Sequence, residues 1–345
     1  MENFSSVCLR LKSNKISILD QRKIPQEEVW LEVTTAAKMH KIIKRLSVRG
    51  APLIGVCASL MIGVLALEKT NSLEQLKEWS EYLKTSRPTA VNLFTCLDRM
   101  LVIMKTNEEK MDETNVKGLL VKEAEAILKE EVEMCERMGE HGAKLIESGD
   151  NILTYCNTGG LATPGVGTAL GVIIKAHQSG KKIHVYACET RPLLQGGRLT
   201  AWELAKNKIP FTLICDNMAA SLMRKGKIDK VFLGADRIAT NGDFANKIGT
   251  YSVAIAAKLH NVPMYSVAPV STIDFECESG DQIEIEQREP KEVRGVRDYI
   301  WAPDCNCYNP AFDVTPIETV SGIVLDVGVF TTKEIQSGAL KKLKK

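Results

Sequence analysis

The spacing of hydrophobic and polar residues changes near residue 150 of the chain. Before this point, residues 51–67 and 121–146 carry apolar side chains at helical spacing, and the second stretch adds Glu and Lys residues suited to a solvated face. Shorter apolar runs at residues 5–11 and 17–20 are typical of strands. The first part of the chain is therefore predicted to be a small mixed α+β domain.

After residue 150, apolar runs alternate with helical patterns. The predicted strands are residues 151–155, 182–187, 211–214, 230–233 and 263–267. This alternation indicates βαβ units and a mostly parallel sheet. We predict an α/β protein with domains at residues 1–125 and 126–345, joined by one long helix. A polar stretch at residues 276–288, in which Ile and Glu alternate, predicts a short strand or hairpin inserted late in the second domain.

Composition and charge exclude several classes of protein. The 345 residues are 44% hydrophobic and 26% charged, as in ordinary globular proteins, and a net charge of +2 argues against a dedicated nucleic-acid surface. The N-terminus lacks the pattern of a secretory signal, and no segment is apolar over the length of a membrane span. The basic tail, residues 341–345, is expected to be a solvated terminus.

Cysteine usage favours a reducing compartment. Ten cysteines are scattered through apolar contexts, which suits the cytoplasm better than a disulfide framework. Most are expected to be small buried hydrophobes. The close pair Cys305 and Cys307 has no second pair and no nearby His, so no metal site is expected there.

Two polar motifs follow predicted strands directly. Asp236 emerges after residues 230–233, at the carboxyl edge where open α/β sheets bind ligands, in a stretch expected to be a catalytic loop. Cys156 follows residues 151–155 and precedes a helical pattern at 167–177, a position that can lower the pKa of a thiol. This motif alone leaves two interpretations open, a reactive base or nucleophile and a buried Cys beside a tight turn.

Other loops are suited to anions. Residues 189–198 combine two arginines with Gln195 and a pair of glycines, a set that fits phosphate or sugar hydroxyls. Arg49 and Arg87 each precede a predicted helix start. Asp216, after another predicted strand, could cap a helix or face the ligand-binding cleft, and capping is the expected role.

The five histidines are not spaced for a metal site or a catalytic triad, and we interpret them as structural. They are His40, His141, His177, His184 and His260. Any acid–base chemistry is then expected to rest on Cys156 and Asp236.

Taken together, the motifs resemble those of the methylthioribose-1-phosphate isomerase family, the aldose–ketose isomerases of methionine salvage. The matching motifs are Val48-Arg-Gly-Ala-Pro52, Arg87-Pro-Thr-Ala-Val-Asn92, Cys156-Asn-Thr-Gly159, Glu189-Thr-Arg-Pro192, Gln195-Gly-Gly-Arg-Leu-Thr-Ala201, Gly234-Ala-Asp-Arg237, Asn241-Gly-Asp243, Ala245-Asn-Lys-Ile-Gly-Thr-Tyr251 and Tyr308-Asn-Pro-Ala-Phe-Asp-Val-Thr-Pro316. The resemblance covers nearly the whole chain. It departs at Tyr155, where many relatives carry His, and at Gly160 and Phe244.

The resemblance implies a Rossmann-like C-terminal domain, a smaller N-terminal domain and a cytoplasmic homodimer that needs no nucleotide or metal. It implies a sugar phosphate as substrate, no nucleic-acid or membrane partner, and Cys156 and Asp236 as the catalytic pair. The substrate-binding residues that it implies are Arg49, Gly50, Ala51, Arg87, Gln195, Asn246 and Lys247.

Three alternative functions remain open at this stage. Related isomerases act on 5-deoxyribose 1-phosphate or on ribose 1,5-bisphosphate, and the second substrate would need another cationic site at C5. The third alternative is a non-catalytic sugar-phosphate sensor, like the alpha, beta and delta regulatory subunits of the exchange factor for translation initiation.

Overall fold

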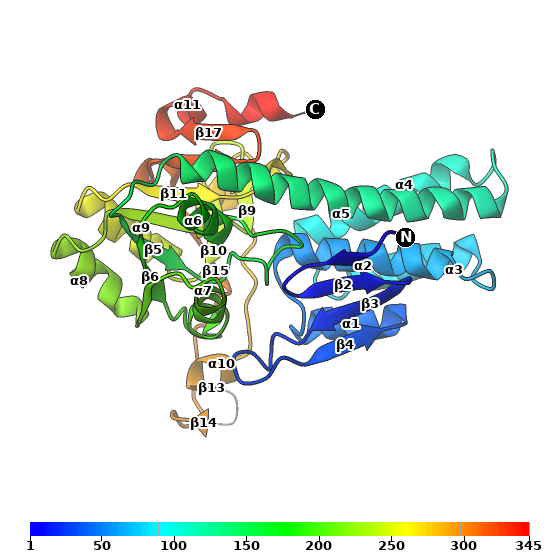
Figure 1. Ribbon diagram of the computed structural model, residues 1–345, viewed down its shortest axis with the longest axis horizontal. Helices are drawn as coiled ribbons and strands as arrows, with labels where there is room; N and C mark the ends of the chain where they lie inside the picture. The colour runs from blue at the N-terminus through cyan, green and yellow to red at the C-terminus, as the bar shows by residue number, and fades with distance from the viewer. Residues whose placement is uncertain (89, 297–298, 345) are drawn as a thin grey trace. The chain divides into compact units, whose positions relative to one another are not determined.

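The computed structural model describes residues 1–88, 90–296 and 299–344, which form two compact units. Unit 1 comprises Met1–Cys135 and Gly160–Gly167, and unit 2 comprises Glu136–Gly159 and Thr168–Lys345 (Figure 1). Thr89 of the predicted anion loop and Lys345 of the basic tail lie outside the described residues. The boundary between the two units falls inside helix α5 (Glu113–Ala143). One long helix therefore continues from unit 1 into unit 2, as predicted. The domain boundary at residue 125 stays a prediction.

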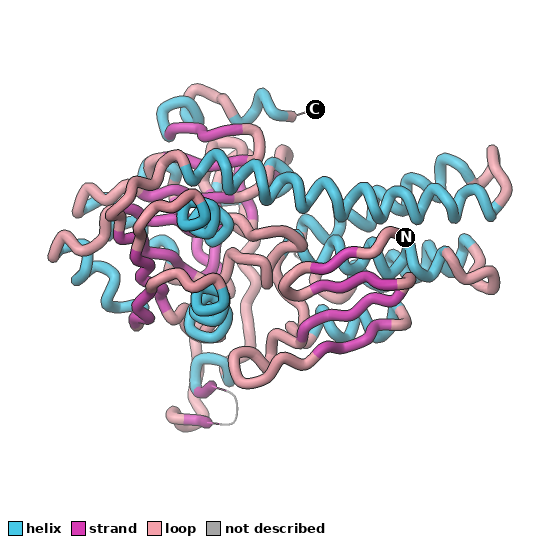
Figure 2. The backbone as a smooth tube through the Cα atoms, viewed as in Figure 1, coloured by secondary structure: helices cyan, strands magenta, loops and turns pink. Residues whose placement is uncertain are grey.

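Unit 1 opens with an antiparallel meander. Its strands are β1 (Phe4–Ser5), β2 (Leu9–Lys12), β3 (Lys15–Leu19) and β4 (Trp30–Val33), in the order β1-β2-β3-β4. In β2, buried Leu9 and Leu11 alternate with exposed Arg10 and Lys12, as expected for a strand with one buried face. Figure 2 shows these strands side by side. The sequence indicated β2 and β3, whereas β4 was not predicted.

The helices of unit 1 surround one apolar helix. They are α1 (Ala36–Lys44), α2 (Ala51–Ala66), α3 (Leu73–Lys84), α4 (Val91–Asn107) and most of α5. Helix α2 is buried along nearly its whole length, because a helix that is apolar on all sides must be covered on all sides. Its contacts with α4 are close: a Cβ on Gly55 would lie 2.7 Å from the Asn92 carbonyl oxygen and 2.8 Å from Cys96 Sγ. The beginnings of α2 and α4 therefore lie against each other.

Unit 2 is built on a Rossmann-like sheet, which confirms the predicted fold class. The strands are β5 (Asn151–Tyr155), β6 (His184–Cys188), β7 (Phe211–Ile214), β8 (Lys230–Gly234), β11 (Met264–Val267), β16 (Gly322–Leu325) and β17 (Gly328–Thr331). They follow the order β17-β16-β11-β8-β5-β6-β7, all parallel except β17, which runs antiparallel to β16. The strand order reverses between β5 and β8, and the carboxyl ends at such a reversal are where α/β sheets bind ligands.

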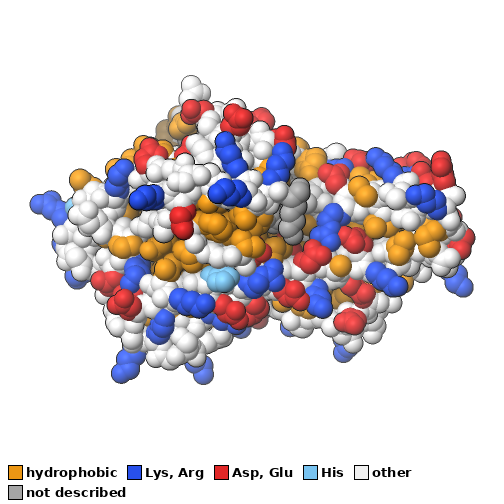
Figure 3. All heavy atoms as spheres, turned by 90° about the horizontal axis from the view of Figure 1, so that it is seen from above, with side chains coloured by type: hydrophobic (Ala, Val, Ile, Leu, Met, Phe, Trp, Pro, Cys, Tyr) orange, Lys and Arg blue, Asp and Glu red, His pale blue; other side chains and the backbone are white. Residues whose placement is uncertain are grey.

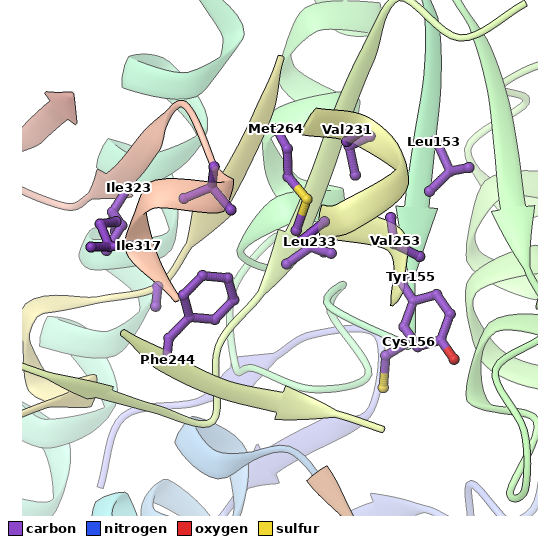
Figure 4. Close-up of a cluster of buried hydrophobic side chains, with 14 of the residues drawn as sticks. Leu153, Tyr155, Cys156, Val231, Leu233, Phe244, Val253, Met264, Ile317 and Ile323 are labelled. Atoms are coloured by element: carbon purple, nitrogen blue, oxygen red, sulfur yellow. The ribbon is translucent and has the colours of Figure 1, made fainter. Parts of the chain in front are cut away.

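Helices cover both faces of this sheet. They are α6 (Ala169–Gln178), α7 (Ala201–Lys206), α8 (Ala219–Arg224), α9 (Thr250–Leu259) and the short α11 (Thr332–Gln336). Right-handed crossovers place α6 and α7 on one face and α8 and α9 on the other, and α8 does pack against α9. Under α9 the core includes Leu153, Val231, Leu233 and Met264 from neighbouring strands, as Figure 4 shows.

A second, smaller sheet extends the carboxyl edge of the first. Its order is β12 (Ile273–Asp274), β9 (Arg237–Ala239), β10 (Phe244–Lys247) and β15 (Phe312–Thr315). The stretch after β8 was expected to be a catalytic loop, and this part of the prediction was wrong: β9 and β10 form an antiparallel pair. All of β10 is buried, so its sequence has no alternation of polar and apolar residues to signal a strand.

The hairpin expected at residues 276–288 is also absent from the described residues. That stretch has a 3₁₀ turn at Gly280–Gln282 and one bridge from Gln287 to Pro310. The alternation arises because Ile283 and Ile285 pack against a small apolar cluster rather than within a paired strand. Beyond it, α10 (Lys291–Arg294) leads into β13 (Gly295–Val296) and β14 (Tyr299–Ile300). No helix within the described residues is both long enough and apolar enough to cross a membrane.

Candidate active site

Cys156 lies at the carboxyl end of β5, beside the reversal of strand order. Its neighbour Tyr155 is paired with Leu233 of β8, so the end of β5 lies directly beside the end of β8. Cys156 is only 6% exposed and has a φ of 64°, in the left-handed region that residues other than glycine rarely occupy. In Figure 4 its sulfur points away from the labelled aliphatic side chains. The structure therefore makes Cys156 a buried residue in a strained turn, a conformation typical of functional sites.

The turn after β5 touches the end of β8. A Cβ on Gly234 would lie 2.9 Å from the Thr158 methyl carbon, so the two chain segments are in close contact. Asp236 follows two residues later and is half-buried, and its amide donates to the Ala245 carbonyl at 2.9 Å. The predicted catalytic residues Cys156 and Asp236 thus belong to two adjoining turns at one edge of the sheet.

Two predicted binding residues lie on β10, next to Asp236. The β9–β10 register pairs Ala245 with Arg237, and the Asp236 amide also donates to the Ala245 carbonyl, so Asn246 and Lys247 directly follow the residue that binds the backbone of Asp236. Asn246 is buried and donates from its side-chain amide to Thr250 Oγ1 at 2.9 Å. Lys247 is also buried, with its ammonium nitrogen 4.5 Å from the centre of the Phe312 ring. A buried ammonium group over an aromatic ring supplies a fixed positive charge for an anionic or hydroxyl-bearing ligand.

Gln195 adds an acceptor from the next loop. It precedes a π-helical turn, η1 (Gly196–Thr200), which continues into α7. A Cβ on Gly196 would lie 1.7 Å from the Cys188 carbonyl oxygen, so only glycine lets this turn lie so close to the end of β6. The Gln195 side chain is 5% exposed, and its Oε1 has no hydrogen-bond partner among the described residues. A buried acceptor of this kind is suited to a substrate hydroxyl.

The two arginines of the same loop have partners within the protein. Arg191 donates to the carbonyl oxygens of Pro192 and Val293, at 2.8 and 2.9 Å, and stacks on Trp301. Arg198 donates to the Leu193 carbonyl oxygen at 3.0 Å. These contacts give both guanidinium groups a structural task and do not favour the phosphate role that the loop suggested.

The expectation that Asp216 caps a helix is wrong. Its two carboxylate oxygens accept the backbone amides of Thr190 and Arg191, each at 2.7 Å. Burial raises the pKa of this carboxyl group, although these amides oppose the shift. Asp216 therefore fixes the loop that follows β6 rather than a helix end.

Within unit 1, the predicted anion-binding residues lie at two helix starts. Gly50 has a φ of 97° and stands at the N-terminus of α2, with half-buried Arg49 before it and Ala51 as the first helical residue. Half-buried Arg87 precedes α4, whose first turn packs against α2. Two adjacent helix N-termini with two guanidinium groups are a physically sound anion site.

The Gly160–Gly167 segment is anchored on unit 1. The Gln21 side-chain amide donates to the Leu161 carbonyl at 2.6 Å, and the Leu53 amide donates to the Ala162 carbonyl at 3.3 Å. A Cβ on Gly50 would lie 2.3 Å from the same Ala162 oxygen. Within unit 1, the Gly160–Gly167 segment therefore packs on the start of α2.

Three side chains around Cys156 were not predicted to be site residues: Thr190, Thr200 and Glu203. All three are buried, and they bind the backbone of Cys156 or the side chain that follows it. Nothing in their spacing marks them, because the contacts depend on the left-handed turn at Cys156 and on the π-helical turn.

The remaining titratable groups add no second site. No cluster of three or more His, Cys, Asp or Glu side chains in the described part of the chain is arranged to hold a metal ion. The structure describes all ten cysteines, and seven of them are buried, which confirms that most are small core residues. Figure 3 shows basic and acidic side chains interspersed on the face in view, without a large surface of one sign.

Known proteins match this chain along almost its whole length. The model of the initiation factor 2 subunit family matches residues 47–332. The methylthioribose-1-phosphate isomerase of Cronobacter sakazakii is 49% identical, over 98% of this chain and 99% of its own. The structure of 5-methylthioribose 1-phosphate isomerase from Pyrococcus horikoshii OT3 has a TM-score of 0.90 at 39% identity, covering 97% of this chain and 96% of its own.

A structure described as the delta subunit of translation initiation factor eIF-2B from A. fulgidus is also similar. It has a TM-score of 0.86 at 40% identity and covers 98% of this chain and 100% of its own. Both kinds of relative share the fold and the family model, whereas the matching curated proteins at 47 to 49% identity carry the isomerase name. The chain therefore belongs to the initiation factor 2 subunit family and, within it, to the methylthioribose-1-phosphate isomerases.

Proposed function

We propose that this chain converts 5-methylthioribose 1-phosphate to 5-methylthioribulose 1-phosphate in methionine salvage. One observation carries the proposal: Cys156 and Asp236 follow the adjacent strands β5 and β8 at the reversal of strand order, in a chain that is 49% identical to a named isomerase. The reaction is an internal transfer of hydrogen, so it consumes no cofactor.

The substrate explains why an acid is needed. The phosphate on C1 keeps the sugar ring closed, so the enzyme must break the bond between C1 and the ring oxygen. We assign this step to Asp236, which must be protonated in the resting enzyme to donate to the leaving ring oxygen. C1 becomes oxocarbenium-like, and the resulting carboxylate then accepts the proton of the C2 hydroxyl group.

Hydrogen then moves from C2 to C1 by one of two routes. In the first, a Cys156 thiolate removes the C2 proton and returns it to C1 through an enediol-like intermediate. In the second, a hydride shifts directly beside a neutral Cys156. Both routes end with a ketone at C2 and a CH₂ group at C1, so atoms and electrons balance.

We assign substrate binding to two groups of residues, each described within its own unit. In unit 1, the guanidinium groups of Arg49 and Arg87 and the amides of Gly50 and Ala51 would hold the phosphate. In unit 2, Gln195, Asn246 and Lys247 would bind the sugar hydroxyls or the phosphate. The support is the pair of adjoining helix starts in unit 1, and the buried polar groups beside Asp236 in unit 2.

Variants at the catalytic pair test these roles. Cys156→Ser and Asp236→Asn should fold normally and lose most turnover. Cys215→Ser, at an exposed thiol, and Asp281→Asn, at an exposed carboxylate, are matched controls that should keep wild-type rates. Near-full activity in either purified catalytic variant would refute the assignment of that residue.

A second candidate is a regulatory subunit that binds a sugar phosphate or nucleotide without turning it over. The similarity to the eIF-2B delta structure from A. fulgidus favours it. Turnover separates the two functions, because a regulator would bind methylthioribose 1-phosphate and leave it unchanged.

We further propose that the chain works as a homodimer in the cytoplasm. The family resemblance supports the dimer, and the ten unbridged cysteines suit a reducing compartment. Light scattering of the purified chain at micromolar concentration should give twice the monomer mass of 38.1 kDa. A single 38.1 kDa species at that concentration would refute the dimer.

A further inference from the structure

The conformation of Cys156 requires support from its surroundings. Its left-handed φ of 64° places a side chain where glycine is normally found, and such residues persist only where neighbouring contacts hold them. The backbone groups of Cys156 lie past the end of β5, beyond the paired residues of the sheet. Buried amide and carbonyl groups must then find other partners.

Thr190 binds the amide of Cys156. Its hydroxyl oxygen accepts that N–H at 2.9 Å and lies 3.2 Å from the Cys188 carbonyl oxygen, to which it donates. Thr190 is fully buried and has a φ of 65°, which is unusual for a β-branched residue. The Asp216 carboxylate fixes it in turn by accepting its backbone amide.

Thr200 binds the carbonyl of the same residue. Its hydroxyl group donates to the Cys156 carbonyl oxygen at 2.6 Å, from the last position of the π-helical turn η1. Thr200 is 1% exposed. Both backbone polar groups of Cys156 are thus bonded to threonine hydroxyls, and these threonines come from the segment between β6 and β7.

Glu203 holds the rest of the turn. This carboxylate is 2% exposed and accepts the Asn157 side-chain amide at 2.7 Å. A Cβ on Gly159 would lie 2.4 Å from its Oε2, so the carboxylate lies against the backbone of the turn and needs glycine there. A carboxylate is costly to bury unless hydrogen bonds satisfy it, which makes its presence beside Cys156 significant.

We infer that Thr200 and Glu203 are positioning residues for Cys156, an inference that rests on the proposed function. With Thr190, they fix the left-handed turn that carries the thiol, at the end of β5 and beside the end of β8. Without these contacts the turn relaxes towards ordinary backbone conformations, and the thiol loses its alignment with the reacting carbons.

Thr200 provides the sharpest kinetic test. Thr200→Val keeps the shape of the side chain and removes the hydroxyl group, whereas Thr200→Ser keeps the hydroxyl group. We expect Thr200→Val to lower kcat about tenfold with little change in KM, and Thr200→Ser to restore most of it. The matched control is Thr319→Val, which removes a hydroxyl–carbonyl hydrogen bond of the same 2.6 Å length to Pro316 and should keep the wild-type kcat.

Alkylation of Cys156 provides a test that needs no substrate. Iodoacetamide labelling, followed by peptide mass spectrometry between pH 6 and 10, gives the rate and the pH midpoint for this one thiol. Thr200→Val and the equally sized Glu203→Gln should each change the reactivity of the Cys156 thiolate. We expect either the labelling rate to change by a factor of about three or more, or the pH midpoint of labelling to shift by the equivalent amount. Glu203→Gln also serves if Thr200→Val does not fold.

The outcomes distinguish the inference from the proposed function. If the wild-type protein does not isomerise the sugar phosphate, the proposed function fails, and the labelling still tests the positioning. If the variants are less stable but keep the wild-type kcat and labelling profile, Thr200 and Glu203 are merely structural and the inference is overturned.

Discussion

Asp313 should make the stability of this protein fall as the pH rises from about 4 to about 6. The residue lies on β15 opposite Asn246, and its carboxylate accepts the backbone amides of Gly249 at 2.7 Å and Tyr251 at 3.2 Å, at the start of α9. Burial raises the pKa of Asp313 from its ordinary 3.8 to about 6, because the cost of burying the charge outweighs these amide donors.

The sign and size of this pH effect on stability follow from the difference between the folded and the ordinary pKa of Asp313. Because the folded pKa is the higher one, the folded chain binds the proton more tightly than the unfolded chain does. The resulting stabilisation is fully present below pH 3.8 and is lost as the pH rises through about 6. Each unit of pKa difference corresponds to about 1.36 kcal/mol. The difference between the folded and unfolded pKa values therefore amounts to about 3 kcal/mol in the free energy of unfolding.

Urea unfolding of the wild-type chain and of Asp313→Asn, from pH 4 to pH 7, measures this contribution. Taking the difference between the two chains at each pH removes the titration of all other groups. The free energy of unfolding of the wild type, relative to Asp313→Asn, should fall by about 2.4 kcal/mol across this range, because the unfolded carboxyl group is already partly ionised at about pH 4. Asp281→Asn, at an exposed position, corrects for the change in net charge. A difference that stays constant, or that rises with pH, would refute the reasoning.

Three further predictions concern close approaches and thiol burial. Gly249→Ala should lower the melting temperature, because Gly249 has a φ of 102° and an added Cβ would lie 2.1 Å from the Tyr155 hydroxyl oxygen. An unchanged melting temperature would contradict that contact. Gly50→Ala should destabilise unit 1 by about 1–3 kcal/mol in urea unfolding, owing to its φ of 97° and the adjacent Ala162 backbone; wild-type stability would contradict this. Because seven cysteines are buried, Ellman's reagent should modify three thiols quickly in the native protein and all ten after unfolding. Rapid reaction of more than three thiols in the native protein would show that the core is more open.

The parallel sheet could be predicted from the sequence because its central strands are short apolar runs bounded by polar turns. The structure confirms residues 151–155 and 211–214 as strands with these bounds and extends the 230–233 run by one residue. The strand order was not contained in these runs. It comes from the pairing that the structure shows.

The smaller sheet could not be predicted, for physical reasons. Strands β9 and β10 are short and mostly buried on both faces, so they lack the alternation that marks a half-exposed strand. The opposite error occurred at residues 276–288, where alternating Ile and Glu reflect packing of one side of an irregular segment. Local periodicity reports which side chains are buried and does not report which backbone groups are paired.

The candidate site likewise contains residues that the sequence predicted and residues that only the folded structure reveals. Cys156 and Asp236 could be selected because each follows an apolar run at the edge where parallel strands end. The roles of Asp216, Thr200 and Glu203 could not, since they depend on a left-handed turn and a π-helical turn that bring distant loops into contact. These contacts are visible only in the folded chain.

The most direct test of the proposed activity is proton and phosphorus NMR of the purified protein with methylthioribose 1-phosphate in deuterated water. Ribose 1,5-bisphosphate and 5-deoxyribose 1-phosphate are run in parallel. We expect selective appearance of the C2 ketone from the methylthio sugar, with deuterium at C1 if a Cys156 thiolate carries the proton and its S–H exchanges with solvent before the return, and no deuterium if a hydride shifts. Binding of the methylthio sugar without conversion of any of the three sugars would contradict the account and identify a regulatory protein instead.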